Sequence, residues 1–442
     1  MSNATQREPK IDVFFGWSDK QLTVYLHKEY SNELVRLTRA YSIRSPEDGN
    51  PNAPESPSYI ALESNYDEVN RTLVSVFALR WLYNNDYETF VRNQPEAVKL
   101  SRESFEWLRN IVTQGIQTPQ DLFALVMSVI VNDLGKDPEL ASECHKRTGK
   151  DVSHLNHDMI LLLAVKEGLV PCLDQLSPAH KADIVRGMEL GAEYNFGQLA
   201  QAESPPTCLG KLHTMSNHER AFDVRFQEQL LDIAGAAGHM DWTCAKKMIE
   251  PICTAYRDVH DASKRVITNE YNLPQAYDLI LEKRARRLFK LKFRMLAITD
   301  QQDRALARLL CMGGVADLET AQLYEAAWDE LEEPVRALLV SSLNAIGSIA
   351  EPAMQPTYMP ALLTRGLAAV ASQDSNKQRE VLHIMFQYLA RIMEMPGGTP
   401  SVSIWERNLL SIVKSVPSDP NFVARPGILL EAEIPKAEIA RA

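Results

Sequence analysis

Apolar residues recur at three- and four-residue spacing along most of this chain, and few segments alternate apolar with polar residues. The first spacing places side chains on one face of an α-helix, whereas alternation is typical of a β-strand. We therefore predict an all-α protein. The chain has 442 residues, of which 45% are hydrophobic, so it can bury a large core.

One proline-rich stretch divides the predicted helices near the N-terminus. Residues 43–58 read "IRSPEDGNPNAPESPS", and prolines at this density cannot continue a helix. We predict an N-terminal extension over residues 1–60 and a single large helical domain over residues 61–442, with decorated ends. Within the extension, "DVFFGWSDKQLTVYL" (12–26) is expected to hold a short strand pair.

Charge and cysteine content exclude several classes of protein. A formal net charge of -11 disfavours a general nucleic-acid binder, because neutralising phosphates needs a basic face. No apolar stretch reaches the ~18 residues that a membrane span needs, and no signal peptide is evident at the N-terminus. The six cysteines lie far apart without a C-x-x-C pair, which argues against a zinc site or a disulfide scaffold. We expect a cytoplasmic protein with neither a nucleic-acid partner nor a membrane span.

Two polar residues interrupt an otherwise apolar helix at "VNDLGKDPEL" (131–140). We predict a helix from about Gln120 that is capped by Gly135, followed by a helix with Asp137 as N-cap and Pro138 at its first position. Asn132 and Asp133 would then lie on the last turn of the first helix. Burying a carboxylate there is costly unless a cation or hydrogen-bond donors compensate it.

A second polar group follows in "DVSHLNHDMILLLAVKEG" (151–168). His154, His157 and Asp158 would occupy the first turns of an apolar helix, with His154 and Asp158 on one face. Carboxylate and amide oxygens suit Mg²⁺, and a neutral histidine could join them or orient a ligand. The two segments together predict a divalent cation site. The alternative is that these residues cap helices and that the histidines are ordinary core residues.

A third segment (216–242) is predicted to form an amphipathic helix that ends at Gly235 or Gly238. Three of its acidic side chains could reach the same site: Asp223, Glu228 and Asp232. The alternative is that they lie on a solvated face.

The strongest local charge is in "KRARRLFKLKFR" (283–294), with seven Lys and Arg in twelve residues. On a helix, one stripe would combine cationic and apolar side chains, namely those of Arg284, Leu288, Lys292 and Met295. Such a stripe suits a ligand with a phosphate head and a hydrocarbon tail. The alternatives are a basic face that pairs with acidic neighbours and a nuclear-localisation or RNA-binding patch.

"VNDLGK" followed by "NHD" resembles the motif of HD-type metal hydrolases, in which a helix ends in His-Asp before Leu/Ile-Gly-Lys. Here Asn132 stands in place of the motif histidine, which replaces a nitrogen ligand by an amide oxygen. This resemblance implies a metal-dependent phosphohydrolase or oxygenase.

The chain as a whole resembles the atypical fungal α-humulene synthases of tropolone sesquiterpenoid pathways. It contains no Asp-Asp dipeptide, so the usual aspartate-rich box of terpene cyclases is absent. "NDLGKDPE" departs from the second usual magnesium box at Lys136 and Glu139. The resemblance implies an all-helical fold around a central apolar cavity, with Mg²⁺ and an essential lysine that hold the diphosphate of farnesyl diphosphate.

By this resemblance the lysine maps to Lys292 in "LFKLKFRM", with Lys290 as the alternative, and Leu288 shapes the product. Arg284 would also bind the diphosphate. The residues expected to hold Mg²⁺ are Asn132, Asp133, His157, Asp158 and Asp232.

The implied reaction is that of a class I-type terpene cyclase, which ionises farnesyl diphosphate to diphosphate and a macrocyclic sesquiterpene, humulene. Mg²⁺ and the lysine would neutralise the leaving group, and a dry pocket would protect the cation from water. A non-catalytic helical scaffold is a further alternative. The oligomeric state stays open.

Overall fold

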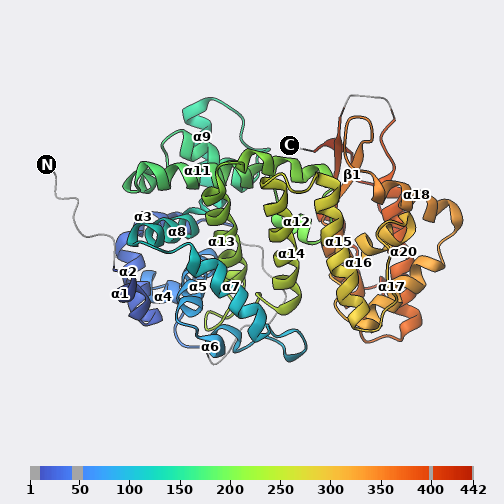
Figure 1. Cartoon of the computed structure of the whole chain (residues 1–442), viewed down its shortest axis with the longest axis horizontal. Coiled ribbons are helices and arrows are strands. Elements are labelled where there is room, and N and C mark those ends of the chain that lie inside the picture. The colour runs from blue at the N-terminus through green and yellow to red at the C-terminus, as the bar shows by residue number, and fades with distance from the viewer. Residues whose placement is uncertain (1–9, 42–52, 398–401, 441–442) are drawn as a thin grey trace. The chain divides into compact units, whose positions relative to one another are not determined.

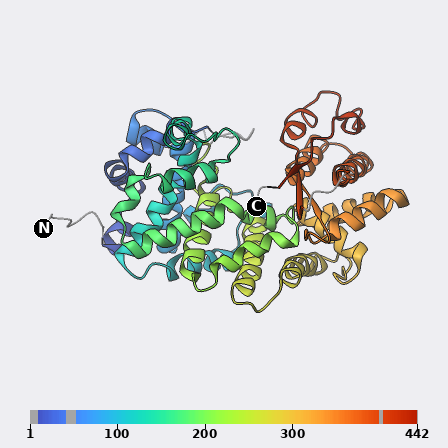
Figure 2. The ribbon, with the colours of Figure 1, turned by 90° about the horizontal axis from the view of Figure 1, so that it is seen from above.

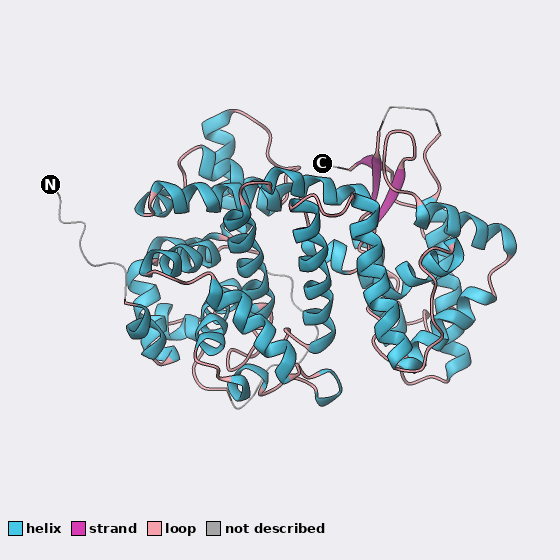
Figure 3. Cartoon of the chain, in the orientation of Figure 1, coloured by secondary structure: helices cyan, strands magenta, loops and turns pink. Residues whose placement is uncertain are grey.

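The computed structural model describes residues 10–41, 53–397 and 402–440. Most of these residues are helical (Figure 3). The predicted all-α class is therefore confirmed. Most of the predicted proline-rich loop lies outside the described residues. Its last two residues, Pro57 and Ser58, begin a helix, so the prediction that residues 43–58 form no helix is wrong there, because proline is tolerated at the first helical position.

The chain forms two compact units. Unit 1 consists of Met1–Ala192 and Thr214–Cys253, and unit 2 of Glu193–His213 and Thr254–Ala442. The short helices of the predicted N-terminal extension belong to unit 1. The predicted division at residue 60 stays a prediction.

In the described part of unit 1, helices joined by loops are the only regular secondary structure (Figure 1). Its α-helices are α1 (Ile11–Gly16), α2 (Asp19–Glu29), α3 (Ser31–Leu37), α4 (Pro57–Leu62), α5 (Asp67–Tyr83), α6 (Tyr87–Val91), α7 (Arg102–Gln114), α8 (Pro119–Val131), α9 (Pro138–Thr148), α10 (His157–Lys166), α11 (Pro178–Glu193) and α13 (Glu219–Gly235). Its 3-10 helices are η1 (Glu96–Val98), η2 (Leu134–Lys136) and η3 (Pro171–Gln175).

The strand pair predicted for residues 12–26 is wrong, because this stretch forms α1 and α2. Ser18 accepts a hydrogen bond from the backbone N–H of Gln21, and the Gln21 side chain accepts one from the backbone N–H of Ser18. This capping box starts α2. Leu22 and Leu26 then recur on the buried face of that helix, so local capping and a four-residue spacing outweigh the strand propensity of the aromatic residues.

Glycines allow α13 to lie close against α5 in the core of unit 1. A Cβ at Gly235 would lie 2.1 Å from Ser75 Oγ and 2.4 Å from the Arg71 carbonyl oxygen. Only glycine fits this approach. The last turn of α13, which carries Asp232, is thereby held beside the first turns of α5.

Unit 2 is a second group of helices with a small sheet. Its helices are α12 (Phe196–Ala200), α15 (Leu273–Lys290), α16 (Gln301–Met312), α17 (Leu318–Asp329), α18 (Glu333–Asn344), α19 (Met359–Ala369), α20 (Ser375–Met393), α21 (Leu410–Ser415) and α22 (Ile428–Glu431). Two further elements cross the boundaries of the units, η4 (Pro206–Met215) and α14 (Glu250–Ile267), and the last residue of α11, Glu193, also belongs to unit 2. The long helix α20 packs against α17, α18 and α19, as the orange and red ribbons of Figure 2 show from a second direction.

The sheet has the order β1-β2-β3, with β1 (Ala353–Thr357), β2 (Ile404–Asn408) and β3 (Glu438–Ile439). β1 pairs with β2 in parallel, with Ala353 opposite Ile404, and β2 pairs with β3 antiparallel. All five residues of β1 are buried, so this strand shows no alternating pattern, and the sequence did not predict it.

No described helix is long and apolar enough to cross a membrane.

Candidate functional site

The segment after α8 turns more tightly than predicted. α8 ends at Val131 and η2 follows, so the predicted continuation to a cap at Gly135 is wrong. Gly135 is needed for packing instead, because a Cβ there would lie 1.9 Å from the carbonyl oxygen of His157. The next helix begins as predicted, with Asp137 as N-cap and Pro138 at the first position. This turn presents Asn132, Asp133 and Lys136 to the start of α10.

Helix α10 begins at His157, with the Asn156 side chain accepting a hydrogen bond from the Met159 N–H. His154 precedes the helix, and its side chain is half exposed beside Asp151. The predicted pairing of His154 and Asp158 on one helix face is therefore wrong.

Lys136 is the centre of the first group of charges. Its Nζ lies 2.8 Å from Asp133 Oδ1 and 3.3 Å from Glu68 Oε2. Arg71 Nη1 lies 2.7 Å from the other oxygen of Glu68. Asp232, from the last turn of α13, contributes a further negative charge to the same group. The ammonium group, which belongs to η2, is thus surrounded by side chains from three other segments: α5, the turn after α8, and α13.

Arg225 is the centre of the second group. Its Nη1 donates to Glu228 and, over 3.0 Å, to Asn132 Oδ1. Its Nη2 lies 3.5 Å from Asp158 Oδ1. Asn132 and Asp158, which were predicted to converge, are thus brought together by an arginine of α13.

Two glycines of α11 make room for this arginine. A Cβ at Gly191 would lie 2.5 Å from Arg225 Nη2, and one at Gly187 would lie 3.1 Å from Arg225 Cβ. Both positions therefore favour glycine, because any larger side chain would press on the arginine.

We call the two groups together the charged cluster. It contains five carboxylates, two more than its three cations. The carboxylates are those of Glu68, Asp133, Asp158, Glu228 and Asp232, the cations are Arg71, Lys136 and Arg225, and Asn132 and His157 complete the cluster.

Burial and neighbouring charges raise the pKa values of two carboxyls of the cluster and lower that of a third. Burial raises the pKa of Glu228 to about 8, although Arg225 opposes this shift. Burial and the Asp133 charge raise the pKa of the half-buried Asp232 to about 7. Burial also opposes ionisation of Asp133, but Lys136 outweighs it and lowers the pKa of that carboxyl. Asp133 is therefore the permanent negative charge beside Lys136.

The donor atoms of the cluster suit a hard divalent cation, because they are mainly carboxylate oxygens. One of them, Glu228 Oε1, is buried without a hydrogen-bond partner. Over the described ranges, however, no three His, Cys, Asp or Glu side chains are placed as ligands of one metal ion. Lys136 and Arg225 lie between the carboxylates instead. As placed, these residues hold the Lys136 ammonium, and a metal ion would have to displace it in order to bind there.

The basic stretch lies in unit 2, and its predicted helical stripe is wrong beyond Leu288. α15 ends at Lys290, and Lys292 follows in the left-handed conformation, with φ of 78°. Arg284 is buried and donates to the Val315 carbonyl oxygen over 3.2 Å, and Leu288 is buried too. Lys290 and Lys292 are exposed.

Several cations of the stretch pair with acidic residues of α14. Arg287 donates to Asp258, and Lys283 Nζ lies 2.5 Å from Asp261 Oδ2. This confirms, for these two residues, the alternative of a basic face that pairs with acidic neighbours.

Sequence reasoning missed the cations of the charged cluster. Lys136 stood within the quoted "VNDLGK" but was not considered as a partner of Asp133, and Arg225 was not considered although it lies in the segment 216–242. Glu68 and Arg71 were not considered. The four-residue spacing of Gly187 and Gly191 was the available signal for a large side chain packed against α11.

A search of curated proteins found no match to the chain, and a search of solved structures found none either. A family model described as a family of unknown function, DUF6829, matches residues 23–429. The match includes the whole charged cluster and the basic stretch. The chain therefore belongs to this family of unknown function.

Proposed function

We propose that the chain is a metal-dependent enzyme that acts on a phosphate ester, with its divalent cation bound at the charged cluster of unit 1. The observation that carries the proposal is the meeting of Asp133 and Asp232 at the same Lys136 ammonium. Asp133 belongs to the stretch that resembles the HD-type motif. His157 lies beside Asp158 at the edge of the cluster, with 3.7 Å between Nε2 and Oδ2. Such a hydrolase needs residues of unit 1 alone.

In this proposal Asp133, Asp232 and His157 hold the cation. When bound, the cation supplies a Lewis acid that polarises a phosphate oxygen and makes bound water more acidic. Lys136, released from the carboxylates, neutralises the phosphate. Asn132 does not act as a ligand, because its Oδ1 already accepts a hydrogen bond from Arg225. It holds Arg225 in position instead, and Arg225 in turn orients Asp158.

The terpene cyclase is the second candidate, and one observation favours it. Around the exposed Lys290 and Lys292, three apolar side chains are also exposed: Phe289, Leu291 and Met295. Cationic and apolar groups side by side suit a prenyl diphosphate. This candidate needs Lys292, which belongs to unit 2, as its diphosphate-binding residue. The buried Arg284 and Leu288 would have to act from within the core of that unit.

Metal dependence tests the hydrolase proposal first. The chelator-treated protein is titrated with Mg²⁺ and Mn²⁺ while its melting temperature is measured, because a ligand that binds the folded state raises stability. We expect stabilisation that Asp133→Asn abolishes. The matched control is Asp174→Asn, which removes the carboxylate of an exposed ion pair with Lys181 in the same unit.

Substrate turnover then separates the two candidates. Hydrolysis of p-nitrophenyl phosphate and of nucleotides by the metal-loaded protein, lost in Asp133→Asn, supports the hydrolase. A hydrocarbon formed from farnesyl diphosphate and Mg²⁺, detected by gas chromatography and lost in Lys292→Ala, supports the cyclase. The absence of metal-dependent stabilisation together with the absence of both products would leave the non-catalytic scaffold.

A further inference from the structure

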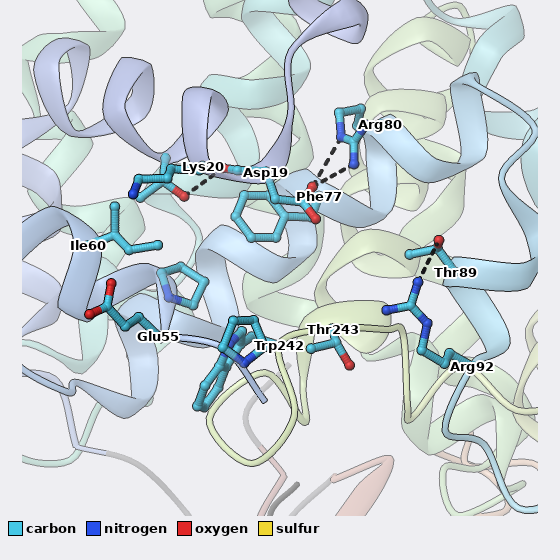
Figure 4. A pocket seen from close by; sticks show the side chains of 13 residues that line it. Asp19, Lys20, Glu55, Ile60, Phe77, Arg80, Thr89, Arg92, Trp242 and Thr243 are labelled. Atoms are coloured by element: carbon cyan, nitrogen blue, oxygen red, sulfur yellow. Dashed lines mark hydrogen bonds and ion pairs between the residues drawn. The ribbon is translucent and has the colours of Figure 1, made fainter. Parts of the chain in front are cut away.

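A second site in unit 1 shares no residue with the charged cluster. It is a cavity of about 400 Å³, formed by α2, α4, α5, α6 and the turn after α13 (Figure 4). Cavities of this size hold small organic ligands.

The apolar wall of the cavity contains two aromatic rings and an aliphatic side chain, those of Phe77, Trp242 and Ile60. The indole nitrogen of Trp242 is itself buried, so this side chain offers its ring and not its N–H to the cavity. Aromatic walls favour a flat aromatic ligand, because ring faces and edges attract one another.

The polar wall carries an excess of positive charge. Three cations, Lys20, Arg80 and Arg92, line the cavity together with two acids, Asp19 and Glu55. Asp19 is already engaged, because Arg80 donates to its Oδ1 over 3.1 Å from Nε and 2.7 Å from Nη2.

Within the described part of the chain, Arg92 donates from its Nη2 to Thr89 Oγ1 over 3.2 Å and forms no ion pair. Its side chain is exposed, so it can bind an anion at the mouth of the cavity. Lys20 is exposed too, but it lies on the other side of the cavity, beside Ile60 (Figure 4).

We propose that this cavity binds a planar aromatic anion of up to about nucleotide size. The ring lies against Phe77 and Trp242, and the anionic group binds Arg92, beside Thr243 at one side of the cavity (Figure 4). This inference is independent of the chemistry proposed for the charged cluster.

Binding is tested with three probes that share this chemistry. Anilinonaphthalene sulfonate reports by its own fluorescence, whereas indole acetate and adenosine monophosphate are followed by calorimetry. The two natural probes distinguish an aromatic carboxylate from a nucleotide as the source of the anion. We expect at least one of the three to bind the wild-type protein at a single site.

Variants then locate the binding site. The variant Arg92→Gln should weaken binding by about tenfold, because a charge-assisted contact is lost. Trp242→Ala removes the ring against which the ligand lies, and should weaken binding several-fold. The control Arg102→Gln changes an exposed arginine paired with Glu88 in the same unit, and should bind as the wild type does.

Two results would overturn the proposal. The first is that none of the three probes binds the wild-type protein. The second is that a probe binds with equal affinity to the wild-type protein and to both cavity variants, since binding would then occur elsewhere. Because all three substituted residues are partly or largely exposed, the variants should fold, and their melting temperatures check this.

Discussion

Replacing Lys136 by methionine is the sharpest test of how the charged cluster is held together. Methionine fills much of the same space but carries no charge. The Lys136 ammonium lies between Asp133 and Glu68, and Asp133 is only 5% exposed. Glu68 keeps Arg71 as a partner in the variant. Asp133 is left as a buried carboxylate that has lost its cation.

The cost of this change follows from the chemistry of Asp133. Removing one partner of a buried ion pair costs about 3–5 kcal/mol. The cost also has a ceiling, because Asp133 can take up a proton instead of staying charged. Protonating a carboxyl with an unfolded-state pKa of about 3.9 at pH 7 costs about 4 kcal/mol, at about 1.4 kcal/mol per pH unit. We therefore expect a loss of about 4 kcal/mol at pH 7 that falls to about 1.5 kcal/mol at pH 5.

Urea unfolding at the two pH values, followed by circular dichroism, measures this loss. The double variant Lys136→Met/Asp133→Asn removes both charges, and should recover most of the stability. The control Lys181→Met breaks an exposed ion pair with Asp174 and should cost less than about 1 kcal/mol. A loss under about 1 kcal/mol for Lys136→Met at pH 7, or one that does not change with pH, would refute the buried pairing.

Three further perturbations test other parts of the structure. The raised pKa values of Glu228, about 8, and Asp232, about 7, mean that these two carboxyls hold more protons in the folded than in the unfolded state above about pH 4. Their contribution to stability should therefore fall as pH rises, by up to about 1.4 kcal/mol per unit for each group until its folded-state pKa is passed. In a urea series Glu228→Gln should lose its share of this fall, and the same pH dependence of stability in the variant and the wild type would contradict it. Gly135→Ala should cost about 1–3 kcal/mol or more by urea unfolding, because its Cβ would meet the backbone of α10, and a neutral effect would show that η2 can shift freely. Arg308→Met should lower the free energy of unfolding by about 3 kcal/mol or more, because the fully buried guanidinium donates to three backbone carbonyls. The melting temperature should fall accordingly, and an unchanged melting temperature would contradict this.

The parts of the fold that the sequence predicts correctly are those fixed by local chemistry. Asp137 and Pro138 start α9, as predicted. α13 also ends at Gly235 as predicted, but this glycine is required by the close approach of α5. Capping depends on a few neighbouring residues, so it can be read along the chain. The end of α15 at Lys290 could not be read, because no glycine or proline marks it and the chain leaves through Lys292 in a left-handed conformation.

The candidate site shows a different limit. Polar residues of the two segments were predicted to meet, and Asn132 and Asp158 do so at Arg225. What the sequence could not show is the identity of the compensating cation. A buried carboxylate needs a positive partner, but a metal ion and an arginine from a distant helix satisfy that need equally well. Arg225 lies 93 residues from Asn132 and 67 residues from Asp158 along the chain, and only the approach of α13 to α11 and α5 places it there.

The cluster contains more carboxylates than cations, and this excess makes it possible to distinguish a metal site from an ion-pair network around Lys136. Three side-chain cations leave two of the five negative charges unbalanced, so protons or a divalent cation must supply the rest. In Lys136→Met the position of the ammonium is empty of charge while Asp133, Glu68 and Asp232 remain. If these oxygens can hold a metal ion, Mg²⁺ or Mn²⁺ should restore part of the lost stability to this variant. The same ions should have little effect on Lys136→Met/Asp133→Asn, which lacks the central carboxylate. Equal responses of the two variants would show that the carboxylates serve the lysine alone, and that the cluster is a structural ion-pair network.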